Sequence, residues 1–117
     1  MGRNHNDQVI KMELSKETKI GIIGLGSMGQ PIADNIIKAG FHLIFSSRTS
    51  KTVDYFKHRA ILASSPVDVI EQAEIILFVL PTDQEIKEIV SAAKNKLSQK
   101  TLINLSTIAP KSAIKLH

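Results

Sequence analysis

The sequence predicts an α/β domain built on a doubly wound parallel sheet of about five strands. Short apolar runs alternate with amphipathic segments along the chain, which is the pattern of successive βα units. Of the 117 residues, 43% are hydrophobic but only 4% are aromatic, so the core must consist mainly of aliphatic side chains. Such a core is typical of parallel strands that helices cover on both faces.

The first unit starts with a strand at residues 19–23, followed by a glycine-rich turn at 24–29 and then a helix. Apolar residues recur at helical spacing in that helix, and Pro31 lies in its first turn, where a missing backbone donor matters least. We expect Gly40 to end the helix and residues 42–46 to form the second strand.

The next units are shorter. Ser50 is expected to cap a helix that runs to about His58, and residues 61–62 should form a short third strand. Ser65 and Pro66 then mark the start of another short helix, with the serine as its cap and the proline in its first turn.

The fourth strand, at residues 75–80, is the most apolar run, and we expect it at the centre of the sheet. Thr82 and Glu85 have the spacing of a capping box for a helix whose apolar stripe reaches Leu97. Residues 101–105 are predicted to form the fifth strand.

The two ends of the chain differ from this pattern. Residues 1–18 are polar and are expected to form a tail before a folded domain of residues 19–117. A helical start at Pro110 is too short to be stable alone, so we expect the domain to be incomplete at its C-terminus. No stretch has the features of a signal peptide or a membrane span, which predicts a cytoplasmic protein.

Composition excludes several kinds of site. Without cysteine the chain has no disulfide and no thiolate ligand or nucleophile, and its four histidines share no metal-ligand spacing. The net charge of +4 comes without a dense basic block, so we expect no nucleic-acid partner.

Gly24, Gly26 and Gly29 form the pattern G-x-G-x-x-G between a predicted strand and a predicted helix, which is the context that the dinucleotide fingerprint requires. The first glycine permits the tight turn, the second lets the backbone approach a pyrophosphate, and the third lets helix and strand pack closely. The helix N-terminus offers N–H groups to the phosphates. The motif therefore predicts a Rossmann-type sheet, the alternative being a turn that binds nothing.

The residues after the second strand indicate which dinucleotide the site would bind. An NAD site is expected to carry a carboxylate there for the ribose hydroxyls, but residues 46–51 contain none. Arg48 can pair with a 2′-phosphate through its planar fork, and Thr49, Ser50 and Lys51 add hydroxyl groups and charge. This chemistry favours NADPH over NADH, unless Arg48 and Lys51 are only solvated surface charges.

Together these features resemble the NADP-binding domain shared by 6-phosphogluconate dehydrogenase, the 3-hydroxyisobutyrate (β-hydroxyacid) dehydrogenases, related glyoxylate reductases and imine reductases. Segments 24–31, 47–49, 79–82 and 104–110 carry the resemblance, in the family's order and spacing. Ser47 stands where the family usually has Asn, and Asn104 where it commonly has Asp.

The resemblance implies how a cofactor is held: the turn binds the pyrophosphate, the second segment the 2′-phosphate, and the third lies along the nicotinamide. The implied cofactor-binding residues are Gly24, Leu25, Gly26, Ser27, Met28, Gly29, Ser47, Arg48, Thr49, Lys51, Leu80, Pro81 and Thr107. Ser106 and Thr107 are implied to contact the substrate. The family's catalytic Lys and its helical C-terminal domain have no counterpart in these residues, so no catalytic residue is assigned.

The sequence therefore predicts the NADP(H)-binding domain of an oxidoreductase that, in the intact family, transfers a hydride to or from a small hydroxy or oxo acid. Alone it should be inactive. A non-catalytic NADP(H)-binding or interaction module would carry the same motifs and remains an alternative. Partners are then NADP(H), a substrate in a complete enzyme, and possibly a second copy of the chain, with no membrane.

Overall fold

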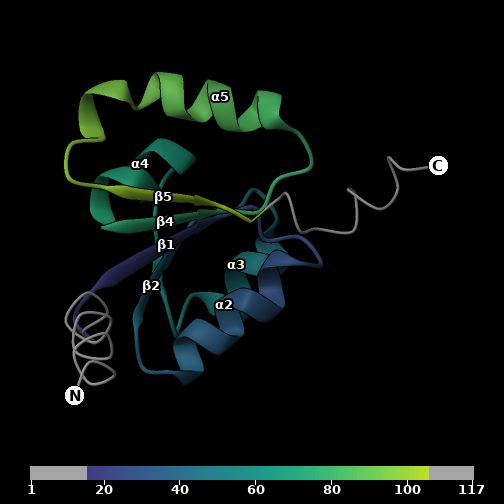
Figure 1. The fold of residues 1–117 in the computed structure, drawn as a ribbon. Helices are drawn as coiled ribbons and strands as arrows, with labels where there is room; N and C mark the ends of the chain where they lie inside the picture. Colours follow the sequence, from purple (N-terminus) through teal and green to yellow (C-terminus); the bar gives the residue numbers. More distant parts are fainter. Residues whose placement is uncertain (1–15, 106–117) are drawn as a thin grey trace, which may run out of the picture.

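The computed structural model describes residues 16–105, which form a five-stranded parallel sheet in the order β3-β2-β1-β4-β5 (Figure 1). The strands are β1 (Lys19–Ile23), β2 (His42–Phe45), β3 (Ile61–Leu62), β4 (Ile75–Phe78) and β5 (Thr101–Asn104). The helices are α2 (Gly29–Lys38), α3 (Ser50–Phe56), α4 (Pro66–Gln72) and α5 (Asp83–Ala92), followed by the 3₁₀ turn η1 (Lys94–Lys96). The predicted doubly wound α/β class is confirmed.

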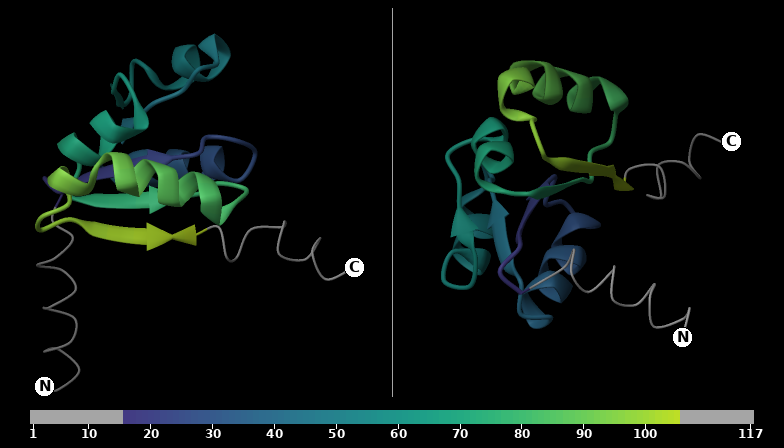
Figure 2. Two further views of the ribbon diagram at one scale, coloured as in Figure 1. Left: turned by 90° about the horizontal axis from the view of Figure 1, so that it is seen from above. Right: turned by 60° about the vertical axis from the view of Figure 1, so that its left-hand side comes forward.

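Alternate residues of the central strands point to opposite faces of the sheet, so each face has its own aliphatic core. Ile22 and Leu43 pack toward α2 and α3, whereas their chain neighbours Ile23 and Ile44 pack toward α4 and α5. Figures 1 and 2 show these two helix pairs on opposite sides of the sheet. The near-continuous apolar runs of β1 and β2 follow from this two-sided burial.

The strand β1 occupies the middle of the sheet, and its glycine lets a helix approach closely. A Cβ on Gly21 would lie 2.5 Å from Cγ1 of Val69 and 2.9 Å from Cβ of Ala73, both on the α4 side. The expectation that residues 75–80 form the central strand is therefore wrong in detail. β4 lies between β1 and β5, and it is apolar because its side chains pack into the cores on both faces of the sheet, Ile76 and Phe78 on one and Leu77 on the other.

Helix caps follow the predictions except at α3. Ser65 Oγ accepts from the Asp68 N–H at 3.1 Å, and Thr82 Oγ1 accepts from the Glu85 N–H at 3.3 Å. Ser50, predicted to be a cap, is instead the first residue of α3, and Thr49 occupies the cap position without a side-chain bond. The extended backbone of Thr49 decides this, because the helix can begin only after it.

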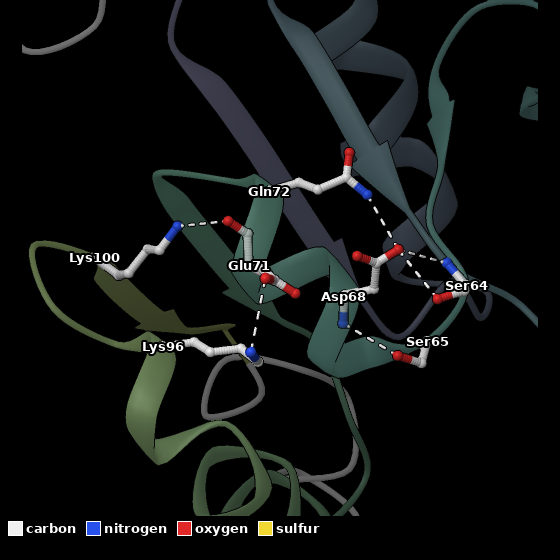
Figure 3. A network of polar contacts seen from close by, with 7 residues as sticks. All are labelled: Ser64, Ser65, Asp68, Glu71, Gln72, Lys96 and Lys100. Atoms are coloured by element: carbon white, nitrogen blue, oxygen red, sulfur yellow. Dashed lines mark hydrogen bonds and ion pairs between the residues drawn. The ribbon is translucent and has the colours of Figure 1, made fainter.

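A polar network joins α4 to the segment before β5 (Figure 3). The Lys100 ammonium donates to the carbonyl oxygens of Glu71 at 2.9 Å and Ala73 at 2.6 Å, which are among the free carbonyls at the end of α4. Lys96 forms an ion pair with Glu71 at 3.6 Å. These contacts attach η1 and the start of β5 to α4.

At the other end of the same helix, the Asp68 carboxylate accepts from the Ser64 backbone N–H at 2.9 Å and from the Ser64 hydroxyl and Gln72 amide, each at 3.1 Å (Figure 3). The Ser64 backbone bond is the main reason that the pKa of Asp68 lies below its ordinary value. The carboxylate thus stabilises the start of α4 in its charged form.

The two outer strands, β3 and β5, are less covered than the three inner ones. Leu102 and Ile103 lie on opposite faces of β5, and each side chain is 38% exposed. Within residues 16–105, no helix is both long enough and apolar enough to cross a membrane. The polar segment 1–15 and the predicted helical start at Pro110 lie outside the described residues.

Candidate functional site

The predicted site residues that the structure describes gather where β2, β1 and β4 end. These strands are neighbours and parallel, so their carboxyl ends meet at one edge of the sheet (Figure 1). The glycine turn leaves β1, Arg48 follows β2, and Leu80 follows β4. In open parallel sheets, ligands bind at this edge, beside the point where the strand order reverses.

Two of the motif glycines are required by the protein itself. Gly24 has φ +106°, and a Cβ there would lie 2.0 Å from the carbonyl oxygen of Val79, just after β4. A Cβ on Gly29 would lie 2.0 Å from the carbonyl oxygen of Gly24. The first glycine therefore lets the turn pass against β4, and the third lets α2 start directly against the turn.

Gly26 differs from both, because nothing in the described protein requires a glycine there. Its φ lies outside the left-handed region, and a Cβ would meet no atom within 4 Å. Ser27 and Met28 beside it are also exposed. The bare backbone at this position faces open space, as expected where a ligand must come close to the main chain.

The N-terminus of α2 is open to an anion. Met28 in the cap position makes no side-chain bond, and the first turn carries no acidic residue. By contrast, α4 and α5 have side-chain caps and acidic first turns. The Gln30 N–H donates to the Gly26 carbonyl at 3.0 Å, and its side-chain amide donates to the Leu25 carbonyl at 3.1 Å, which steadies the turn. The helix dipole, with no side-chain cap and no acidic residue to offset it, thus favours negative charge there.

The segment after β2 presents unpaired cations. Ser47 Oγ accepts from the Thr49 N–H at 3.1 Å, which folds the loop back on itself. Arg48 and Lys51 are exposed, and neither forms an ion pair with another residue of the described segment 16–105. Residues 46–51 contain no carboxylate. The loop is therefore a local concentration of positive charge beside the glycine turn.

A pocket of about 630 Å³ lies between the starts of α2 and α3. Its lining residues are Gln30, Thr49, Lys51, Thr52, Asp54 and Tyr55. Of these, Thr49 and Lys51 were predicted, whereas Gln30, Thr52, Asp54 and Tyr55 were not. A helical-wheel comparison could have placed Tyr55 on the same face as Lys51, but nothing local indicates that α2 faces that side.

The end of β4 completes the described part of the site. Leu80 Cδ2 lies 3.1 Å from the position of a Cβ on Gly24, so the predicted Leu80–Pro81 pair adjoins the turn. Asn104 is paired in register with Phe78, so β5 ends at the same edge as β4. The predicted contacts Ser106 and Thr107 lie outside the described residues. Within residues 16–105, no three His, Asp or Glu side chains are grouped as metal ligands.

Strand order, an open glycine turn and an uncapped helix start define a Rossmann-type dinucleotide-binding domain. Sequence comparison agrees, since residues 19–117 match the family model described as the NAD binding domain of 6-phosphogluconate dehydrogenase. The chain belongs to this family.

Relatives and solved structures show the same likeness. Mitochondrial 3-hydroxyisobutyrate dehydrogenase of Rattus norvegicus is 37% identical over 107 residues, covering 87% of this chain and 32% of that protein. The 3-hydroxyisobutyrate dehydrogenase of Pseudomonas aeruginosa is 32% identical over 104 residues, covering 85% and 35%. An Aspergillus terreus reductive aminase, solved with NADPH and ethyl-5-oxohexanoate, has a TM-score of 0.69 at 28% identity, covering 86% and 35%. The chain thus spans about a third of these relatives.

Proposed function

We propose that this chain binds NADP(H) through the glycine turn and the loop after β2. The observation that carries the proposal is Gly26, whose missing side chain serves no need of the protein's own packing and leaves the main chain open beside the uncapped start of α2. A pyrophosphate needs both of these features, because it is anionic and must approach the backbone closely.

The loop after β2 supports NADP(H) rather than NAD(H). Arg48, Thr49 and Lys51 would hold the 2′-phosphate by charge-assisted hydrogen bonds, and the loop of residues 46–51 that carries them contains no carboxylate. The similar reductive aminase was solved with NADPH, which agrees with this choice. Leu80 and Pro81, next to the turn, would lie along the nicotinamide, and Ser106 and Thr107 are proposed to contact the reacting end.

In the whole protein to which such a domain belongs, we propose oxidoreductase chemistry on a small hydroxy or oxo acid. NADP(H) supplies the hydride acceptor or donor, whereas the residues of this chain bind and orient it. The proposal draws on 3-hydroxyisobutyrate dehydrogenase relatives that this chain matches over about a third of their length.

The test is a calorimetric titration of the 117-residue chain with NADPH and NADH, together with Arg48→Met. A charge-assisted hydrogen bond contributes about 1.5–3 kcal/mol, so NADPH affinity should fall roughly tenfold to a hundredfold in the variant while NADH affinity stays nearly constant. Lys87→Met is the control, since it removes an equal charge from an exposed position of α5, on the other face of the sheet. Equal affinity of the unaltered chain for both coenzymes would overturn the NADP(H) assignment.

A further inference from the structure

A cluster of polar contacts joins α2 to α3 one helical turn away from the pocket. Tyr55 Oη donates to Asp34 Oδ2 at 3.1 Å, and Arg59 Nη2 forms an ion pair with Asp34 Oδ1 at 3.2 Å. Arg59 also donates to the Tyr55 carbonyl at 3.3 Å, and its guanidinium lies 4.6 Å from the centre of the Tyr55 ring. We call Asp34, Tyr55 and Arg59 the α2–α3 bridge.

The bridge and the pocket lie on the same faces of the two helices. Gln30 of the pocket precedes Asp34 by four residues in α2, and Lys51 precedes Tyr55 by four residues in α3. Residues at this spacing are neighbours on a helix surface. Tyr55 itself belongs to both, because its side chain contacts Asp34 and lines the pocket. The bridge therefore lies at one end of the pocket that Lys51 lines.

The packing of α3 consists mainly of the buried Phe56 and the partly buried Val53, which contact the same core cluster. The helix has seven residues, only Phe56 among them is buried, and its first turn has no side-chain cap. A helix this short is unstable by itself, so its position depends on the contacts it makes. Phe56 anchors it against Phe45 of β2, with the ring centres 5.6 Å apart. The bridge adds a polar attachment of α3 directly to α2 and so restricts how the two helices can move against each other.

The bridge also controls charge near the pocket. Asp34 is an acidic residue of α2 four positions beyond Gln30, about 6 Å along the helix axis. Arg59 neutralises it in the structure. Without Arg59, an unpaired carboxylate would lie near the proposed phosphate position and would oppose binding of a dianion more than that of a neutral hydroxyl.

We propose that the α2–α3 bridge is a positioning device for coenzyme choice: it holds the start of α3 at the distance from α2 that a 2′-phosphate requires, and it keeps the Asp34 charge neutralised. The inference rests on the proposed binding of NADP(H). It adds residues that act by positioning α3 rather than by pairing with the phosphate. Its effect should fall on the preference for NADPH over NADH rather than on folding.

The experiment measures dissociation constants for NADPH and NADH with Arg59→Gln and Tyr55→Phe in the full chain. An exposed ion pair contributes up to about 1 kcal/mol, so each variant should weaken NADPH binding relative to NADH by about twofold to fivefold. Lys96→Met is the matched control, because it removes a cation and an exposed ion pair with Glu71 of α4, on the other face of the sheet from the pocket. Its coenzyme ratio should match that of the unaltered chain.

The outcomes separate this inference from the function on which it rests. If the unaltered chain prefers NADPH and both bridge variants keep its ratio, the positioning role is overturned while NADP(H) binding stands. The same conclusion follows if Lys96→Met shifts the ratio as much as Arg59→Gln. If Arg59→Gln does not fold, Tyr55→Phe decides, since it keeps the ring and the guanidinium contact and removes only the hydroxyl bond to Asp34. A chain without NADPH preference would overturn both.

Discussion

Adding a side chain at the three glycines of the turn should affect two different properties, stability at two positions and coenzyme binding at the third. Gly24→Ala and Gly29→Ala should make the domain easier to unfold, whereas Gly26→Val should leave its stability unchanged and weaken coenzyme binding at least tenfold. The structure distinguishes them because the first and third glycines lie against backbone carbonyl oxygens, and the second faces open space.

The magnitudes follow from the same contacts. Even close C–H···O contacts keep carbon and oxygen about 3.3–3.6 Å apart, so the 2.0 Å approach at Gly29 requires a shift of at least ~1.3 Å between turn and helix. Such overpacking costs about 1–3 kcal/mol of the free energy of unfolding. Gly24→Ala adds about 1–2 kcal/mol for a left-handed backbone. At Gly26 neither penalty applies, and an exposed substitution stays within about 0.5 kcal/mol.

The assay combines urea unfolding, followed by far-ultraviolet circular dichroism, with a NADPH titration of each variant. Gly26→Val should show an unaltered urea midpoint and at least a tenfold loss of NADPH affinity, because its side chain fills the space proposed for the pyrophosphate. Gly29→Ala should show a lower midpoint. The reasoning is refuted if Gly26→Val lowers the midpoint as much as Gly29→Ala does, or if it binds NADPH as tightly as the unaltered chain.

Three further outcomes are expected. Lys100→Met should lower the free energy of unfolding by about 1–3 kcal/mol in urea, because it removes the donor for the Glu71 and Ala73 carbonyls at the end of α4; an unchanged midpoint would contradict this. The pKa of Asp68 is lower in the folded state than in the unfolded chain. Its contribution to stability should therefore be complete above the unfolded-state pKa and lost as pH falls through the folded-state pKa. Asp68→Asn should accordingly flatten the acid side of a curve of unfolding free energy against pH. The 117-residue chain should bind NADPH without oxidising it in the presence of small oxo acids, which absorbance at 340 nm would detect, because the family's catalytic Lys motif has no counterpart in it.

The candidate site rests mainly on local signals in the sequence. The glycine spacing follows a strand and precedes a helix, and Arg48 occurs where a carboxylate would indicate NAD. A parallel strand that is buried on both faces has a continuous run of apolar residues in the sequence, so β1, β2 and β4 could also be predicted. The cap position of α3 was predicted wrongly as Ser50 instead of Thr49. Thr and Ser are adjacent there, and only the backbone conformation decides between them.

By itself the sequence determined the class of the fold, the order of its elements and the chemistry offered at the ends of β1 and β2. The tertiary structure alone decided that β1 rather than β4 lies in the middle, that Gly26 is free of packing demands while Gly24 and Gly29 are not, and that Asp34 meets Tyr55 and Arg59. The physical reason is range. Periodicity and spacing report which face of an element is apolar or charged, whereas the identity of the neighbour across 21 or 25 residues of chain depends on how the elements pack.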